Sequence, residues 1–170
     1  MRNWSADDAE STYRIQRWGD GYFGIGSDGK LQVLPDRGAS DSSIGLQDVV
    51  DELREKNIQF PVVIRFQDIL KNRVRQLNKA FSDVIAEAAY QGSYRGVYPI
   101  KVNQMREVVD EVVSAGRPFH YGLEAGSKAE LMAVLSYDTG NEALTICNGY
   151  KDEDFLRLTL IGSKLQRNVV

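Results

Sequence analysis

The chain has 170 residues, of which 42% are hydrophobic and 26% charged, and 21 basic against 24 acidic side chains give a net charge of −3. This balance argues against a nucleic-acid-binding protein, which would carry a basic excess or stripe, and no apolar run approaches the roughly 20 residues of a membrane span. The polar, acidic start is unlike a secretory signal, so we expect a cytoplasmic protein.

The first third of the sequence predicts short strands followed by one helix. The strands are expected where aromatic and β-branched residues lie between turn signals, at residues 13–18, 22–25 and 30–34. An Asp-Gly turn joins the last two as a hairpin. Apolar residues then recur with helical spacing and predict a short helix, at Leu46, Val49, Val50 and Leu53.

Residues 24–29 match the Gly-x-Gly-x-x-Gly pattern of dinucleotide-binding loops. In that fingerprint a helix begins inside the glycine pattern, so that its backbone amides meet the pyrophosphate. Here the strand-like run Lys30-Leu31-Gln32-Val33-Leu34 follows instead. We therefore interpret the pattern as part of the hairpin and not as a nucleotide site.

The remaining two thirds predict strands and helices in alternation. Four strands are each followed by a helix, and a fifth begins near the last residue, at residues 61–66, 96–100, 119–123, 143–147 and 165–170. Ser127 and Glu130 fit a capping box at the start of the third of these helices. The long first helix has one apolar and one charged face, as expected of a solvated outer helix. Four successive β-then-α units imply a parallel sheet with right-handed crossovers.

Lys101 stands at the carboxyl end of the strand at residues 96–100, the edge at which parallel-sheet proteins place their chemistry. A lysine amine at that edge could form a Schiff base with an aldehyde cofactor. Spacing alone, however, favours an ordinary solvated lysine at a strand end. The helix that follows has one apolar face, built from Val108, Val109, Val112 and Val113.

Three more residues are candidates for a functional site. Glu124 closes the strand expected beside that of Lys101, so its carboxylate could approach the lysine or a cofactor and balance the local charge. It could equally be a carboxylate that starts a helix segment, favoured by the helix dipole. His120, the only histidine, is interpreted as a core or strand-end residue and not as a base. Cys147, the only cysteine, excludes an intrachain disulfide framework and is interpreted as a buried strand thiol.

Residues 96–104 resemble the pyridoxal-phosphate lysine motif of the biosynthetic (fold-type III) arginine decarboxylases. They read Gly96-Val97-Tyr98-Pro99-Ile100-Lys101-Val102-Asn103-Gln104. Related ornithine and diaminopimelate decarboxylases carry a shorter Tyr-x-x-Lys-x-Asn version, and the residues flanking the lysine here favour the arginine branch. Further pieces resemble the family in the same order, at residues 17–23, 61–66, 121–131 and 147–152. The resemblance extends from about Tyr13 to the last residue.

This resemblance implies an α/β fold: the first half of a (β/α)8 TIM barrel, alanine racemase-like, preceded by a short β-rich segment. We expect residues 1–59 to form the amino-terminal hairpin and helix segment, and residues 60–170 to form a partial pyridoxal-phosphate-binding barrel of about four βα units. A complete barrel takes about 250 residues, and family members are longer and carry a second, β-rich domain. The chain is expected to correspond to the amino-terminal portion of such an enzyme.

By the same resemblance, the chain is expected to serve the pyridoxal 5'-phosphate-dependent decarboxylation of L-arginine to agmatine and CO2 in polyamine (spermidine) biosynthesis. Lys101 would be catalytic and would bind the cofactor, and Glu124 would be a second cofactor-binding residue. Magnesium and homo-oligomeric assembly are implied for the full-length enzyme, with no metal ligands assigned. The glycine-rich phosphate loop, the acid facing the pyridine nitrogen and the residues that read the guanidinium lie later in family members.

Two alternatives remain open from the sequence. The substrate could be another basic amino acid, because the ornithine and diaminopimelate decarboxylases share the lysine chemistry. Alternatively, the chain could be a non-catalytic truncated remnant that associates with a full-length homologue, since an open half barrel exposes strand edges and apolar faces.

Overall fold

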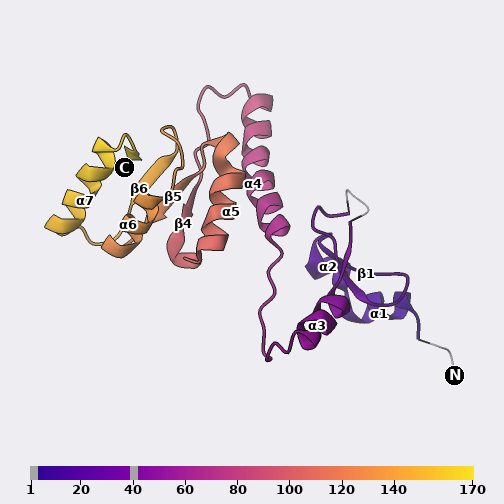
Figure 1. Ribbon diagram of the computed structural model, residues 1–170. Coiled ribbons are helices and arrows are strands. Elements are labelled where there is room, and N and C mark those ends of the chain that lie inside the picture. Colours follow the sequence, from indigo (N-terminus) through magenta and orange to yellow (C-terminus); the bar gives the residue numbers. More distant parts are fainter. Residues whose placement is uncertain (1–3, 39–41) are drawn as a thin grey trace. The chain divides into compact units, whose positions relative to one another are not determined.

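The computed structural model describes residues 4–38 and 42–170, and the chain divides into two compact units, Met1–Ile69 and Leu70–Val170. Figure 1 shows both units and labels their helices and strands where there is room. The domain boundary expected between residues 59 and 60 stays a prediction. Within the described ranges, no helix has the length and hydrophobicity that a membrane crossing requires.

The amino-terminal unit combines helices with a small antiparallel sheet, in the order α1 (Ala6–Tyr13), α2 (Ile15–Gly19), β1 (Phe23–Ile25), β2 (Leu31–Val33), β3 (Ile44–Gly45) and α3 (Leu46–Glu55). The strands pair in the order β1-β2-β3, with Phe23 opposite Val33. Because β1 and β2 form an antiparallel hairpin, the interpretation of residues 24–29 is confirmed. No helix begins within those residues, as a dinucleotide loop would need.

The strand expected at residues 13–18 is wrong, because this part of the chain is helical. Ser5 caps α1: its Oγ accepts the N–H of Asp8 at 3.2 Å, and Asp8 Oδ2 accepts the N–H of Ser5 at 3.0 Å. This capping box, with acidic side chains in the first turn, stabilises a helix. Arg14, in the left-handed conformation, then separates α1 from α2.

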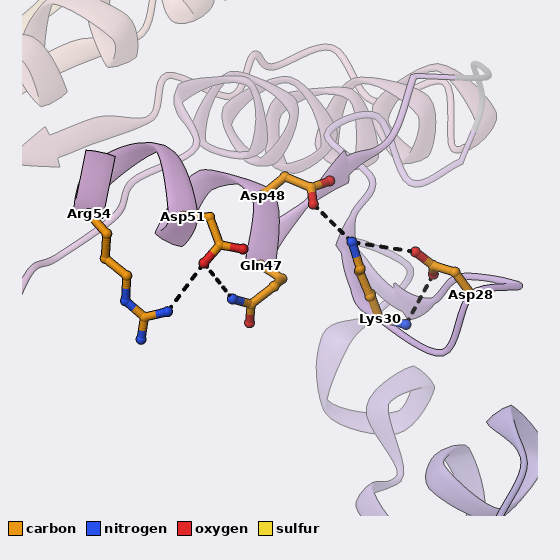
Figure 2. Close-up of polar contacts among 6 residues, drawn as sticks. All are labelled: Asp28, Lys30, Gln47, Asp48, Asp51 and Arg54. Carbon is orange, nitrogen blue, oxygen red and sulfur yellow. Dashed lines mark hydrogen bonds and ion pairs between the residues drawn. The ribbon is translucent and has the colours of Figure 1, made fainter. Parts of the chain in front are cut away.

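An ion pair fastens α3 to the hairpin, as Figure 2 shows. Lys30, just before β2, places its Nζ 3.0 Å from Asp48 of α3 and 4.0 Å from Asp28. The hydrogen bond to Asp48 raises the pKa of Lys30 above its usual value. All three side chains are exposed, so the pair orients α3 and contributes little stability.

The carboxy-terminal unit is built on a parallel sheet. Helix α4 (Gln67–Glu87) precedes the first strand of this sheet. The elements after α4 are β4 (Val97–Pro99), the 3-10 turn η1 (Ile100–Val102), α5 (Arg106–Gly116), the 3-10 turn η2 (Arg117–Phe119), β5 (Gly122–Ala125), α6 (Lys128–Ser136), β6 (Leu144–Cys147), α7 (Glu153–Lys164) and β7 (Asn168–Val169). The strands pair in chain order, β4-β5-β6-β7, and all run parallel. The expected α/β fold with a parallel sheet is therefore confirmed.

Helices α5, α6 and α7 share one hydrophobic core with the sheet, made of Ile100, Val109, Val113, Leu123, Ala125, Leu131, Val134, Cys147 and Phe155. Residues paired across parallel strands share a face, and neighbours along a strand alternate between faces. Leu123 and Ala125 therefore face the helices. Pro99, Glu124 and Ile146 lie on the opposite face, where they are only partly buried.

The strand expected at residues 61–66 is wrong, since these residues form no strand before α4 begins at Gln67. Their side chains do alternate between exposed and partly buried, but within the described ranges β4 pairs with β5 alone. A parallel strand is held by its ladder to a neighbour, so an alternating pattern by itself does not form one. The described residues contain three βα units followed by β7, where about four units were expected.

Asp152 makes an acid-sensitive contact at the start of α7. It accepts the N–H of Phe155 at 2.9 Å and a hydrogen bond from Lys128 of α6 at 2.6 Å. The Lys128 ammonium, and then the Phe155 N–H, hold the pKa of Asp152 below its ordinary value of 3.8. A carboxyl whose pKa is lower in the folded chain stabilises the fold above its unfolded pKa, and this contribution is lost as the pH falls through the folded pKa.

We expect Asp152→Asn to lower the urea midpoint of the chain near neutral pH, and this difference from the parent should shrink as the pH falls below about 4. Asparagine still caps a helix, so the difference isolates the carboxylate. Asp154→Asn is the matched control, because Asp154 lies in the same turn and its carboxylate forms an exposed ion pair with Arg157, at 3.5 Å. Urea titrations over this pH range test the prediction, and a loss independent of pH would contradict it.

Candidate functional site

Lys101 lies directly after β4, in the short turn η1, and its side chain is exposed. The turn is fixed from both sides: Ile100 is buried in the core, and the Tyr98 hydroxyl donates to the Asn103 carbonyl at 3.2 Å. Asn103 Oδ1 in turn accepts the N–H of Met105, which leads into α5. Within the described ranges, the Lys101 amine has no hydrogen-bond or salt-bridge partner. The turn after β4 therefore holds an exposed lysine side chain in a defined place.

Glu124 lies on the strand beside that of Lys101, as expected. In the register of the parallel pair β4·β5 it is opposite Pro99, two residues before Lys101. Its side chain is on the sheet face that the helices leave uncovered, and it is partly buried there. The sheet thus brings a carboxylate and a free amine to neighbouring strands at the same edge.

Asn148, which follows β6, is a site residue that the sequence analysis missed. Its Nδ2 donates to Glu124 Oε1 at 3.2 Å, and its Oδ1 accepts the N–H of Gly149 at 2.8 Å. The carboxyl ends of β4, β5 and β6 therefore carry a lysine, a glutamate and an asparagine side by side. A search for polar residues at the end of each expected strand would have found this one.

Glu130, which the sequence analysis named only as part of a helix cap, joins the turns that follow β4 and β5. Its Oε2 accepts the N–H of Gly126 at 2.7 Å, and its Oε1 accepts a hydrogen bond from Gln104 at 3.4 Å. Ser127 caps α6 by accepting the Glu130 N–H, as expected. A capping box would also need the Glu130 side chain to accept the N–H of Ser127. This part of the prediction is wrong, because the Glu130 carboxylate accepts the N–H of Gly126 instead. Glu130 thereby connects the lysine-bearing loop to the loop after Glu124.

His120 and Cys147 both lie outside this group of residues. His120 precedes β5, so it is at the opposite end of the parallel strands from Lys101. Of its two expected positions, core or strand end, the core position is wrong, because His120 is exposed, with its Nε2 3.6 Å from Glu142, and it lies just before β5. Cys147 is buried among the helix-facing residues, with its Sγ 3.7 Å from Thr159 Oγ1, which confirms the buried strand thiol.

Comparison with known proteins gives a consistent picture. Residues 70–169 match the family model described as the pyridoxal-dependent decarboxylase, pyridoxal binding domain. Biosynthetic arginine decarboxylases from Rhodopirellula baltica and Gloeobacter violaceus are 47% and 45% identical to the chain, over 98% and 97% of its length. The crystal structure of the biosynthetic arginine decarboxylase from Campylobacter jejuni is 31% identical, with a TM-score of 0.83 over 92% of this chain. The chain spans about a quarter of the length of these relatives, 25%, 26% and 25% respectively.

Proposed function

The chain belongs to the pyridoxal-dependent decarboxylases, whose pyridoxal-binding domain it carries over residues 70–169, and from this premise we propose that it supplies the lysine of an enzyme that converts L-arginine to agmatine and CO2. The observation that carries this proposal is the position of Lys101 at the carboxyl end of β4, beside the strand of Glu124, with no partner for its amine among the described residues. The names of the relatives support arginine as the substrate.

The residues of this edge fit pyridoxal phosphate in their chemistry. A primary amine without a partner is what the cofactor aldehyde requires. Glu124 offers a carboxylate with only Oε1 hydrogen-bonded among the described residues. We assign Lys101 and Glu124 to cofactor binding, and Lys101 to catalysis.

When bound, the cofactor supplies an electron sink for the bond that releases CO2. Lys101 would hold the cofactor through its Nζ, and the turn closed by Tyr98 and Asn103 would fix where that Nζ can reach. When it is not holding the cofactor, the Lys101 Nζ would be available to carry a proton at the same edge. Glu124, on the neighbouring strand, balances the positive charge of the amine.

Substrate choice is tested by measuring CO2 release from arginine, ornithine, lysine and diaminopimelate with the natural polypeptide purified from its source. Arginine should give the highest kcat/KM of the four. A preference for ornithine or diaminopimelate would overturn arginine while leaving the role of Lys101 intact.

The non-catalytic alternative also has an observation in its favour. The outer residues of α7 are apolar and exposed, at Leu156, Leu160 and Ile161, as expected of a surface that packs on another polypeptide segment. An antibody against this chain would measure the mass of the natural polypeptide. A band several times heavier than 19.1 kDa favours the enzyme, and a band at that mass favours the remnant.

Further expectations belong to the whole enzyme. From the composition and charge we propose a cytoplasmic location and no nucleic-acid partner, and by family resemblance we propose homo-oligomeric assembly and a magnesium requirement. Fractionation tests the location, light scattering tests the assembly, and assays with and without a chelator test the magnesium requirement. Within the described ranges, no three His, Cys, Asp or Glu side chains come together as a metal site would need, so no ligands are assigned to magnesium.

Tyr98→Phe should weaken the turn that presents Lys101. Removing the hydroxyl deletes the bond to the Asn103 carbonyl, a contribution of about 1 kcal/mol, while the ring keeps its place in the core. We expect cofactor attachment to the natural polypeptide to slow by about fivefold. Tyr150→Phe is the control, since Tyr150 is exposed. Stopped-flow absorbance after cofactor addition measures the rate, and equal rates in both variants would contradict the role of the hydroxyl.

A further inference from the structure

The side chain of Asn148 has a fixed orientation. Its Oδ1 accepts the N–H of Gly149 at 2.8 Å, so its Nδ2 is the end that meets Glu124. An asparagine amide offers two donors on nitrogen and an acceptor on oxygen, and the Gly149 N–H can bond only to the oxygen. Asn148 therefore presents a donor to the carboxylate of Glu124.

The backbone around Asn148 is held against the neighbouring strand. The Asn148 N–H donates to the Ala125 carbonyl at 2.8 Å, which extends the ladder between β5 and β6 by one bond. Gly149 has a φ of +79°, and a Cβ at this position would collide with the carbonyl oxygen of Gly126. The turn after β6 thus lies directly against the turn after β5. Neither the backbone nor the amide of Asn148 can shift without breaking one of these contacts.

We propose that Asn148 is a positioning residue that sets the orientation of the Glu124 carboxylate toward the cofactor held by Lys101. This inference rests on the proposed function of Lys101 and Glu124. By taking Oε1, the Asn148 amide leaves Oε2 of Glu124 as the oxygen without a partner among the described residues. A carboxylate held by one oxygen keeps its charge in a defined place, which a freely rotating side chain would not.

Two substitutions of Asn148 test this positioning role. Asn148→Asp keeps the shape and the acceptor for the Gly149 N–H, but it replaces the donor at Glu124 with a second carboxylate, so attraction becomes repulsion. Asn148→Ala removes the side chain and both of its hydrogen bonds, and serves as the second variant. Asn141→Asp is the matched control, because it makes the same change of charge at an exposed position that precedes β6.

The experiment uses the natural polypeptide loaded with pyridoxal phosphate. Borohydride reduction followed by peptide mass analysis measures how much cofactor is attached to Lys101, and visible circular dichroism measures how the attached cofactor is held. For Asn148→Asp and Asn148→Ala we expect unchanged attachment, a weaker visible dichroic band, and a fall in kcat of about ten- to a hundredfold with little change in KM. Asn141→Asp should match the parent in each measurement.

A dichroic band and kcat equal to those of the parent in both Asn148 variants would overturn the positioning role and leave the proposed function standing. Absence of any adduct on Lys101 in the parent would overturn the proposed function, and the role of Asn148 with it. A merely structural role predicts lower thermal stability with an unchanged band, and that result would also overturn the proposal.

Discussion

Replacing Lys101 with alanine should abolish covalent attachment of pyridoxal phosphate and lower decarboxylation by at least about a thousandfold, equivalent to about 4 kcal/mol of barrier. The effect is large because the amine is exposed, has no partner among the described residues, and is the group that holds the cofactor in the proposed function. Alanine leaves the turn itself in place, since Ile100 and Tyr98 supply its packing. The fold should therefore survive the substitution.

Borohydride reduction of the natural polypeptide, followed by mass analysis of its peptides, measures the attachment directly. Lys164→Ala is the matched control, because Lys164 is an exposed lysine in the last turn of α7. The control should retain the reduced adduct and its activity. A reducible adduct that persists in Lys101→Ala would assign the attachment to another lysine.

Replacing Phe155 with alanine should destabilise the chain by about 3–5 kcal/mol. Phe155 is 1% exposed and projects from α7 into the core that also holds Leu131, Val134 and Cys147. Its removal leaves a cavity under a helix that has few other buried side chains. Because a typical domain has only about 5–15 kcal/mol of stability, this loss is a large fraction of the total.

Leu160→Ala provides the comparison on the same helix. Leu160 is 63% exposed, so its truncation should change stability by about 0.5 kcal/mol or less. Urea unfolding of the chain, followed by far-ultraviolet circular dichroism, measures both variants. Equal losses of unfolding free energy in Phe155→Ala and Leu160→Ala would show that α7 does not pack through Phe155. Such a result would also remove the basis for placing the helices on one face of the sheet.

The fold places the proposed site residues at the carboxyl ends of the parallel strands. Parallel strands bring the residues that follow them to one edge, and in this chain α5, α6 and α7 pack on one face of the sheet. Lys101, Glu124 and Asn148 follow or close three successive strands, and the register places Glu124 opposite Pro99 and Ile146. Glu130 and Gln104 then join two of the loops at that edge.

Local signals in the sequence determined much of this architecture. Apolar periodicity placed α4 and α5, and the expected cap at Ser127 placed the start of α6. The β-runs placed β4 and β6, and β5 begins three residues later than the strand expected at residues 119–123. The same signals placed Lys101 at a strand end and rejected the glycine pattern at residues 24–29 as a nucleotide loop. These features depend on residues close together in the chain, which is why they could be predicted.

Other features required the tertiary structure. The segment at residues 61–66 has an alternating pattern but no strand in this chain, because a ladder needs a neighbour that the pattern does not provide. Residues 13–18, where a strand was expected, contain the end of α1, which Ser5 caps, and most of α2, which has no side-chain cap. The bond between Asn148 and Glu124 joins residues on different strands, so it follows from strand register. Sequence thus determined which groups stand at the strand ends, and only the pairing of the strands decided which of them touch.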